Sequence, residues 1–232
     1  MDSALQAISR RFKRSVARHG VTGTARLAIV HLSLPLRRRW TALADRRFDG
    51  RYGIDTGGFI RHTDLGDRGD GLHYQATAPK VFRAIVQALP ASPGRLTFVD
   101  VGCGKGRTLI LAEELGFRRV IGVEISHELV QTARANLRAR GSEAYVQHVD
   151  ALHVDFPDED LLIYLYNPFG EQTLRGVLHR LRRSLAATPR FALVAYLMPA
   201  HRHLFDEPEF TIIQATEDWL LMRATASVVG SE

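Results

Sequence analysis

The stretch TFVDVGCGKGRTL, residues 97–109, decides how the rest of the chain is interpreted. An apolar run leads into three glycines at every second position, and a mixed apolar segment follows them. Glycine is conformationally costly, so three glycines behind an apolar run indicate a turn where something approaches the backbone closely. The stretch therefore predicts a buried strand, a glycine loop and the start of a helix, which is where doubly wound α/β folds bind ligands.

Composition places the chain among ordinary globular proteins. It has 232 residues, of which 45% are hydrophobic and 24% charged, which is enough to bury a sizeable core. The single cysteine, Cys103, excludes an intrachain disulfide, and we interpret it as a small filler. A reducing compartment such as the cytoplasm fits this usage. The longest apolar run, 25–36, contains a charged residue and is too short to span a bilayer.

Positive charge is concentrated at the N-terminus. Residues 1–51 contain 12 Lys or Arg and 3 Asp or Glu, whereas the rest of the chain contains 19 and 22. A helical apolar stripe lies among these basic residues: Leu5, Ile8, Phe12 and Val16. We therefore expect residues 1–48 to form a basic helical extension. It could dock on its own domain, lie on an anionic membrane surface, or, less favourably, grip nucleic acid.

Residues 49–73 differ in composition from the segments on either side of them. Seven glycines and five aspartates fall within 49–72, with no regular periodicity. This segment is expected to be a linker or a lid. Residues 74–232 are expected to form the main domain.

Strands and helices alternate through this domain. Apolar runs predict strands at 95–101, 118–125, 143–149, 161–166, 190–197, 209–215 and 218–224. Amphipathic segments predict helices at 80–89, 106–115, 127–140 and 171–185. Alternation of this kind predicts an α/β fold with a parallel sheet. The last two strands have no helix between them, so we expect them to be antiparallel.

The glycine loop does not match two common nucleotide motifs. A dinucleotide site needs G-x-G-x-x-G, but residue 107 is Arg, and a P-loop needs a G-K-[ST] that is missing. Asp100 stands two residues before the first glycine. A carboxylate there would repel a pyrophosphate and attract a cation.

These residues resemble the class I S-adenosylmethionine-dependent methyltransferases. Their strand–D-x-G-x-G-x-G–helix hallmark is read here from Asp100 to Gly106, and the resemblance extends over residues 74–226. It implies a Rossmann-like, doubly wound, seven-stranded sheet and S-adenosyl-L-methionine as cofactor. Asp100 would then face the charged methionine moiety, and Gly102, Gly104 and Gly106 would let the cofactor lie against the backbone.

The same resemblance implies further site residues. Glu124 would take the ribose hydroxyls, and Asp150 would bind the adenine amino group. The segment HYQATAPKVF is similar to one in protein lysine methyltransferases, and it implies that Tyr74, Gln75 and Thr77 cover the cofactor's carboxylate. A plain helix cap by Thr77 is the alternative.

The acceptor is suggested by the triplet Asn167-Pro168-Phe169. It resembles part of the Asn/Asp-Pro-Pro-Tyr/Phe motif of enzymes that methylate amino or amide nitrogens, although the second proline is missing. The resemblance gives this triplet the catalytic role, with Asn167 also beside the cofactor. We expect a methyltransferase acting on a nitrogen of a protein side chain or small molecule. A nucleic-acid base methyltransferase and a cofactor-binding protein without catalysis stay open.

No metal site and no specific partner beyond the unknown acceptor are expected. His201 and His203 stand close together without an accompanying set of ligands, so we interpret them as a solvated pair. A cytoplasmic location is expected, with membrane association through residues 1–48 as an open option.

Overall fold

The computed structural model describes residues 40–61 and 70–226. The expected stripe from Leu5 to Val16 and part of the expected lid therefore lie outside the described residues. The chain divides into two compact units, Met1–Phe48 and Asp49–Glu232. In the first unit, the described residues 40–48 are helical. Within the described ranges, no helix has the length and apolar character needed to cross a membrane.

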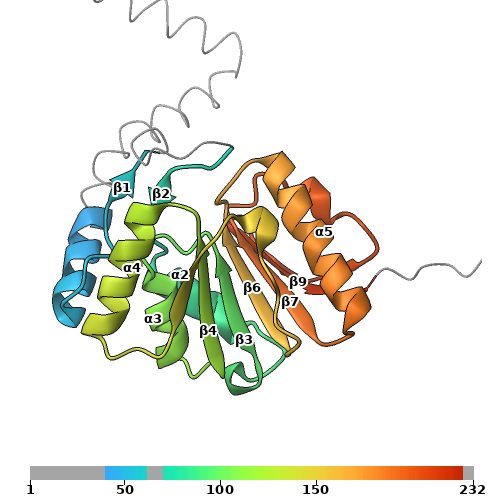
Figure 1. Ribbon diagram of the computed structural model, residues 1–232, viewed down its shortest axis with the longest axis horizontal. Helices are drawn as coiled ribbons and strands as arrows, with labels where there is room; N and C mark the ends of the chain where they lie inside the picture. The colour runs from blue at the N-terminus through green and yellow to red at the C-terminus, as the bar shows by residue number, and fades with distance from the viewer. Residues whose placement is uncertain (1–39, 62–69, 227–232) are drawn as a thin grey trace, which may run out of the picture. The chain divides into compact units, whose positions relative to one another are not determined.

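A seven-stranded sheet forms the centre of the second unit (Figure 1). Its strands follow the spatial order β5-β4-β3-β6-β7-β9-β8. Their bounds are β3 Thr97–Val101, β4 Arg119–Glu124, β5 Tyr145–His148, β6 Leu161–Tyr166, β7 Ala192–Leu197, β8 Phe210–Ala215 and β9 Trp219–Ala224. The first five are parallel, whereas β9 pairs antiparallel with both β7 and β8. The expected fold class and antiparallel last pair are confirmed.

Helices flank this sheet and cover its strands. They are α2 Pro79–Gln87, α3 Arg107–Glu114, α4 His127–Ala139 and α5 Glu171–Ala187. Strands β3 and β7 are buried along their whole length, as expected for parallel strands covered on both faces, and β3 buries Thr97 and Asp100 together with its apolar residues. The strand order reverses between β3 and β6, which are direct neighbours. The glycine loop and Asn167 follow these two strands, so the fold brings them together.

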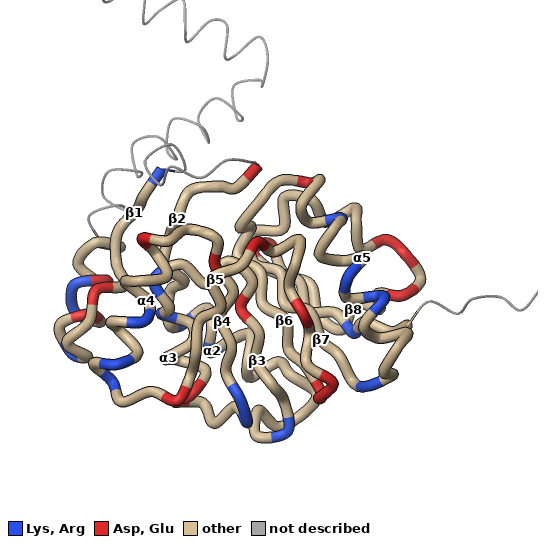
Figure 2. Tube along the Cα trace, viewed as in Figure 1, with Lys and Arg blue, Asp and Glu red and all other residues tan. Residues whose placement is uncertain are grey.

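The edge strand β8 differs from the interior strands. All of its residues except Phe210 are exposed, and Ile212 and Ile213 are among them. Basic and acidic positions are interspersed over the part of the chain drawn in colour in Figure 2.

The expected loop between 49 and 73 contains regular structure in its first half. Residues 49–52 are helical, so the expectation of an irregular segment beginning at Asp49 was wrong. Strand β1, Phe59–Ile60, pairs antiparallel with β2, Tyr74–Gln75. Both strands have only two residues, and such short strands leave no recognisable alternation in a sequence.

Candidate active site

A cavity of about 630 Å³ opens where the parallel strands end. This volume lies within the range of about 300–1,000 Å³ usual for small-molecule sites. Eleven of the twelve residues singled out from the sequence line it: Tyr74, Gln75, Thr77, Asp100, Gly102, Gly104, Glu124, Asp150, Asn167, Pro168 and Phe169.

Gly106 is the one singled-out residue that does not line the cavity. It has a φ of 82° and immediately precedes α3, and a Cβ there would lie 3.3 Å from the Cβ of Ala133 on α4. The third glycine therefore serves the turn and the packing of two helices. The expectation that it contacts the cofactor finds no support in its position.

The other two loop glycines are crowded by the protein itself. A Cβ on Gly102 would lie 2.5 Å from the Cβ of Pro168, and one on Gly104 would overlap the ring of Tyr74. Both glycines also have positive φ values, 91° and 54°. A side chain at either position would displace a residue that lines the cavity.

Asp100 is a buried carboxylate facing this cavity. Burial raises the pKa of Asp100 to about 7, and the charge of Glu124 adds to this, whereas a hydrogen bond from the hydroxyl of Thr108 opposes it. A buried carboxylate is best stabilised as an anion by a cation placed against it. The site therefore suits a positively charged ligand at this point.

Glu124 organises the loop that surrounds it. Its Oε2 accepts a hydrogen bond from Gly104 N at 2.9 Å, and its Oε1 accepts from the backbone N–H groups of Ile125 and Ser126 at 3.0 Å. The carboxylate thus ties the end of β4 to the glycine loop while it lines the cavity.

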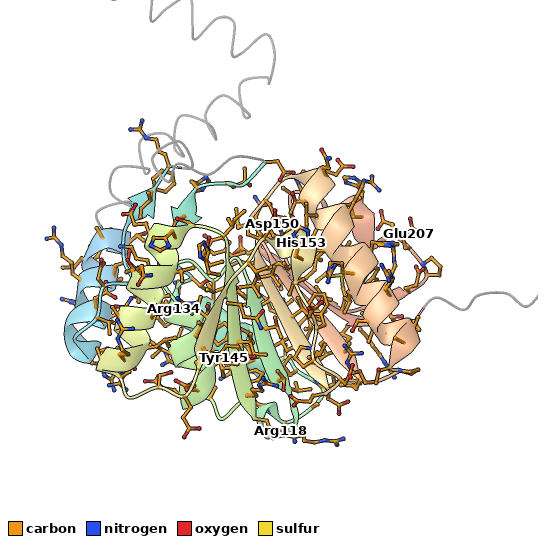
Figure 3. All side chains as sticks on the ribbon, in the orientation of Figure 1. Arg118, Arg134, Tyr145, Asp150, His153 and Glu207 are labelled. Carbon is orange, nitrogen blue, oxygen red and sulfur yellow. The ribbon has the colours of Figure 1, made fainter. Side chains whose placement is uncertain are left out.

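Asp150 lies at the same end of the sheet, as does His153, whereas Arg118 marks the opposite end (Figure 3). The Oδ1 atom of Asp150 accepts a hydrogen bond from Leu152 N at 2.8 Å and thereby caps the short helix Ala151–His153. Asp150 therefore combines a cap with a place in the cavity wall.

Asn167 has a strained backbone at the end of β6. Its φ is 38°, and Met198, at the end of the neighbouring β7, has a φ of 52°. Among the described residues, these are the two non-glycine positions with positive φ, and both line the cavity. The hydroxyl of Tyr196 donates to Asn167 Oδ1 at 3.1 Å. Strain of this kind persists only where surrounding contacts impose it, and it is frequent at functional sites.

Pro168 and Phe169 complete the triplet. The carbonyl of Pro168 accepts from Leu72 N at 3.0 Å, and Phe169 is buried in the main hydrophobic cluster. The triplet is thereby joined to the segment that precedes β2.

Tyr74 lies in β2 and Thr77 lies between β2 and α2, and both line the cavity. The hydroxyl of Tyr74 donates to the carbonyl of Thr56 at 2.5 Å. The Thr77 hydroxyl lies 2.9 Å from that of Tyr164, and α2 begins after Ala78 without a side-chain cap. The alternative that Thr77 is a plain helix cap was wrong.

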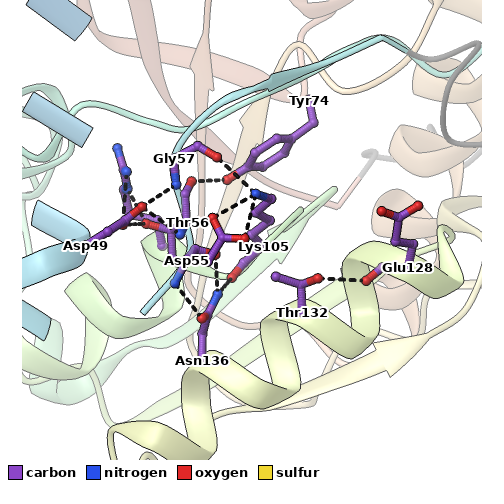
Figure 4. A network of polar contacts seen from close by, with 10 residues as sticks. Asp49, Asp55, Thr56, Gly57, Tyr74, Lys105, Glu128, Thr132 and Asn136 are labelled. Carbon is purple, nitrogen blue, oxygen red and sulfur yellow. Dashed lines mark hydrogen bonds and ion pairs between the residues drawn. The ribbon is translucent and has the colours of Figure 1, made fainter. Parts of the chain in front are cut away.

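A polar network beside the glycine loop was not foreseen from the sequence (Figure 4). Residues 49–57, which we call the strap, lie against α3 and α4. Lys105 Nζ is 3.0 Å from Asp55 Oδ1, and Asn136 Nδ2 donates to the carbonyls of Asp55 and Lys105. Arg107 donates to Thr56 and Asp49. Arg107 also lines the cavity.

Two other sequence interpretations can be compared with the structure. Cys103 is buried, and burial raises the pKa of its thiol well above the ordinary value, which fits a filler and disfavours a nucleophile. His201 and His203 are not simply solvated, because their rings lie 3.9 and 3.3 Å from the carboxylate of Glu171. No group of three or more residues able to hold a metal ion occurs among the described residues.

Comparisons with known proteins agree with this geometry. A family model described as a methyltransferase domain matches residues 98–188. The chain is 30% identical over 124 residues to a geranyl diphosphate 2-C-methyltransferase of Streptomyces lasalocidi, covering 50% of this chain and 40% of that protein. It is 38% identical over 56 residues to a ribosomal protein L11 methyltransferase of Thermotoga maritima, covering 24% and 21%.

A third relative is a protein-lysine N-methyltransferase of Saccharolobus islandicus, 33% identical over 69 residues that cover 29% of this chain and 42% of the relative. The chain thus spans less than half the length of each of these relatives. A solved structure of a predicted N6-adenine-specific DNA methylase from Listeria monocytogenes superposes with a TM-score of 0.51 at 14% identity, covering 65% and 52%. That likeness shows a shared fold.

The family match, the strand order and the cavity at the reversal point together define a class I S-adenosylmethionine-dependent methyltransferase domain. The cofactor of this class is S-adenosyl-L-methionine. Its ammonium and sulfonium charges fit the buried carboxylate of Asp100, and its size fits the cavity.

Proposed function

We propose that the protein transfers a methyl group from S-adenosyl-L-methionine to an amino or amide nitrogen of a protein side chain or small molecule. The observation that carries this proposal is the position of Asn167. Asn167 has a strained backbone, and its side-chain amide accepts a hydrogen bond from Tyr196. It lines the same cavity as Asp100 and Glu124. The cofactor, when bound, supplies the electrophilic methyl group, and the chain supplies the position of the two reactants.

The acceptor side depends on the amide oxygen of Asn167. An amide oxygen has two lone pairs, so Oδ1 can accept from the Tyr196 hydroxyl and from an acceptor N–H together. Burial raises the pKa of Tyr196, which keeps its hydroxyl protonated. A nitrogen held this way keeps its own lone pair free for attack. A cationic amine would first have to lose a proton, because only the neutral amine is a nucleophile.

The charge of the cavity favours this class of acceptor over nucleic acid. Four carboxylate side chains are among the described residues that line it, and one Arg accompanies them: Asp70, Asp100, Glu124, Asp150 and Arg107. An acidic wall repels the phosphate backbone that dominates nucleic-acid affinity. Two relatives named as methyltransferases of a ribosomal protein and of protein lysine support a protein acceptor.

Labelled cofactor tests the proposal directly. The protein is incubated with S-adenosylmethionine carrying a tritiated methyl group and with lysate separated into protein, nucleic-acid, lipid and small-molecule fractions. We expect label on nitrogen in protein or in small molecules. Asn167→Ala should keep cofactor affinity within about threefold and reduce transfer by about a hundredfold or more, because Asn167 orients the acceptor.

The control variant is Gln214→Ala, which removes an exposed side-chain amide from edge strand β8. It should transfer at the rate of the unmodified protein. Label in nucleic acid would replace the proposal with a base methyltransferase. Label on carbon, as in the name of the geranyl diphosphate relative, would refute the nitrogen acceptor. Cofactor binding without any transfer would indicate a binding protein without catalysis.

A further inference from the structure

Tyr196 is a buried tyrosine on β7 whose ring and hydroxyl have different surroundings. It is 1% exposed, and its ring belongs to the main hydrophobic cluster, with its centroid 5.5 Å from that of the Phe205 ring. A phenylalanine ring could make the same apolar contacts, so packing alone does not account for the hydroxyl. Burying a hydroxyl group is costly unless it is hydrogen-bonded, and the group therefore needs an explanation from its partners.

The hydroxyl of Tyr196 reaches the ends of two neighbouring strands. It donates to Asn167 Oδ1 at 3.1 Å, at the end of β6, and it accepts from His201 N at a longer 3.4 Å, in the turn after β7. A backbone N–H can only donate, so the hydroxyl oxygen is the acceptor in that contact and its hydrogen is left for Asn167. Both bonds thus run in one direction, from His201 through Tyr196 to the amide oxygen.

The two turns that Tyr196 joins contain the strained positions Asn167 and Met198. The backbone of Met198 is fixed by its own hydrogen bonds, because its N–H donates to the carbonyl of Asp218 at 2.7 Å and its carbonyl accepts from Ala200 N at 2.8 Å. The side chain of Asn167 is held by Tyr196. Asn167 and Met198 line the cavity, whereas Tyr196 does not. Tyr196 can therefore act on a bound acceptor only through its neighbours.

We propose that Tyr196 is a positioning residue for methyl transfer, which fixes the orientation of the Asn167 side-chain amide so that Oδ1 faces the acceptor N–H. The proposal rests on the function proposed above, because it concerns the residue that holds the acceptor. If the amide turned over, its NH2 group would face the Tyr196 hydroxyl, whose hydrogen would lose its acceptor. A donor would then stand where the acceptor N–H needs an oxygen. Tyr196 therefore favours the one orientation that can hold an N–H donor.

Nuclear magnetic resonance of the asparagine side chains tests this contact without substrate or cofactor. The chain has two asparagines, Asn136 and Asn167, so protein made with isotope-labelled asparagine gives two side-chain amide signals, and Asn167→Ala identifies which is which. Tyr196→Phe removes one oxygen atom and keeps the ring. It should shift the carbonyl-carbon and NH2 signals of the Asn167 side chain. The signals of Asn136, whose amide bonds to the carbonyls of Asp55 and Lys105, should stay in place.

The rate of methyl transfer tests the consequence of the contact. With tritiated S-adenosylmethionine and the lysate fraction that the unmodified protein labels, Tyr196→Phe should reduce the rate about 10- to 30-fold and keep cofactor affinity within about twofold. A double-mutant cycle separates positioning from a general effect on stability. In the Asn167→Ala background, Tyr196→Phe should change the remaining rate by less than about twofold, because the residue through which it acts is already gone.

Tyr145→Phe is the control, because it makes the same chemical change away from the cavity. Tyr145 is the first residue of β5, at the opposite end of the sheet from the cavity, and its hydroxyl accepts from Arg119 Nη2 at 2.8 Å. Removing this hydroxyl should change neither the side-chain signals of Asn167 nor the rate of transfer.

The outcomes separate this assignment from the function it rests on. Asn167 signals that stay in place in Tyr196→Phe would overturn the assignment. An unchanged rate of transfer would overturn it too, as would an equal loss of rate in the Asn167→Ala background, because Tyr196 would then act by another route. If the unmodified protein labelled no fraction while the Asn167 signals still moved, the proposed function would be wrong although Tyr196 holds the amide.

Discussion

Asp100 links cofactor binding to pH. Because its pKa is raised to about 7, it is largely protonated below that value in the free protein, whereas a cationic ligand favours its anion. We therefore expect affinity for S-adenosylmethionine to rise from about pH 6 to about pH 8, with protons released on binding. Asp100→Asn should bind weakly and lose this pH dependence. Calorimetry in buffers of different ionisation enthalpy measures both effects.

The same residue affects the stability of the free protein in the opposite direction. A carboxyl whose pKa is higher in the folded state than in the unfolded chain stabilises the fold at low pH. That contribution is lost as pH rises from about 4 towards 7. Asp100→Asn should therefore have a flatter melting profile across this range. A cofactor affinity independent of pH in the unmodified protein would contradict the assignment of Asp100.

Single residues differ in how far the sequence could reveal them. The position of Asp100, Glu124 and Asn167 at one edge of the sheet was predictable, because each stands at the end of an apolar run and parallel strands end at one edge. The roles expected for them came from the family resemblance. From the sequence, Arg107 was noted only because it stands where the dinucleotide motif G-x-G-x-x-G requires glycine. Two of its contacts come from Asp49 and Thr56, which lie 58 and 51 positions earlier in the chain. No local pattern encodes contacts at that separation.

Among the elements, the strap depends on one half-buried carboxylate. Asp49→Ala would remove the acceptor of four hydrogen bonds, leave the N–H groups of Thr56 and Gly57 without that acceptor, and weaken the hold on Arg107. Breaking a buried charged contact costs about 3–5 kcal/mol of unfolding free energy, and the partial exposure of Asp49 places the expected loss at about 2–3 kcal/mol. Denaturant titration measures the loss of unfolding free energy. Hydrogen exchange should be faster at the backbone amides of Thr56 and Gly57.

Asp55→Ala is the comparison within the same strap. The side chain of Asp55 is 71% exposed, and its partner Lys105, which is 12% exposed, keeps a hydrogen bond to the carbonyl of Gly57 when the Asp55 carboxylate is removed. Exposed pairs contribute about 0–1 kcal/mol, so this variant should unfold almost as the unmodified protein does. Equal losses in the two variants would show that the strap is not fixed through Asp49.

The strap also shows why the long strands and helices were predicted from the sequence and the short elements were not. Five parallel strands and four helices have long periodic or continuous apolar patterns, and their existence was predicted correctly. The strap and the β1–β2 pair are short, rich in Gly and Asp, and shaped by side-chain bonds to backbone N–H groups. Such bonds leave no periodic signal, so the segment looked irregular.

For the chain as a whole, the role of the basic extension, residues 1–48, is inferred from its sequence. We propose that the stripe formed by Leu5, Ile8, Phe12 and Val16 is buried, because amphipathic helices usually pack their apolar face. Full-length Ile8→Asp/Phe12→Asp should then melt at a lower temperature than the unmodified protein. Ala7→Asp/Ala17→Asp, on the opposite side of the predicted helix, is the control and should melt normally.

Liposome flotation distinguishes whether this stripe packs against the protein itself or against an anionic membrane. Each basic residue near an anionic membrane contributes about 1 kcal/mol, so a membrane role requires flotation with anionic and not neutral vesicles. Loss of that flotation in the stripe variant, with an unchanged melting temperature, would identify a membrane contact. If the stripe variant matched its control in both measurements, the stripe would have neither role.

The glycine loop also carries the chain's single cysteine, Cys103. Cys103 is 5% exposed, and a Cβ on Gly122 of β4 would lie 2.7 Å from its Sγ, so the thiol is packed against that strand. Because so little of the thiol is exposed, an alkylating reagent should reach it faster when the loop separates from β4 than when the loop is packed against that strand. The alkylation rate of the folded protein therefore reports how often the loop opens, without any engineered label. Because every modified molecule is modified at the same atom, intact mass alone is enough to follow the kinetics of that opening.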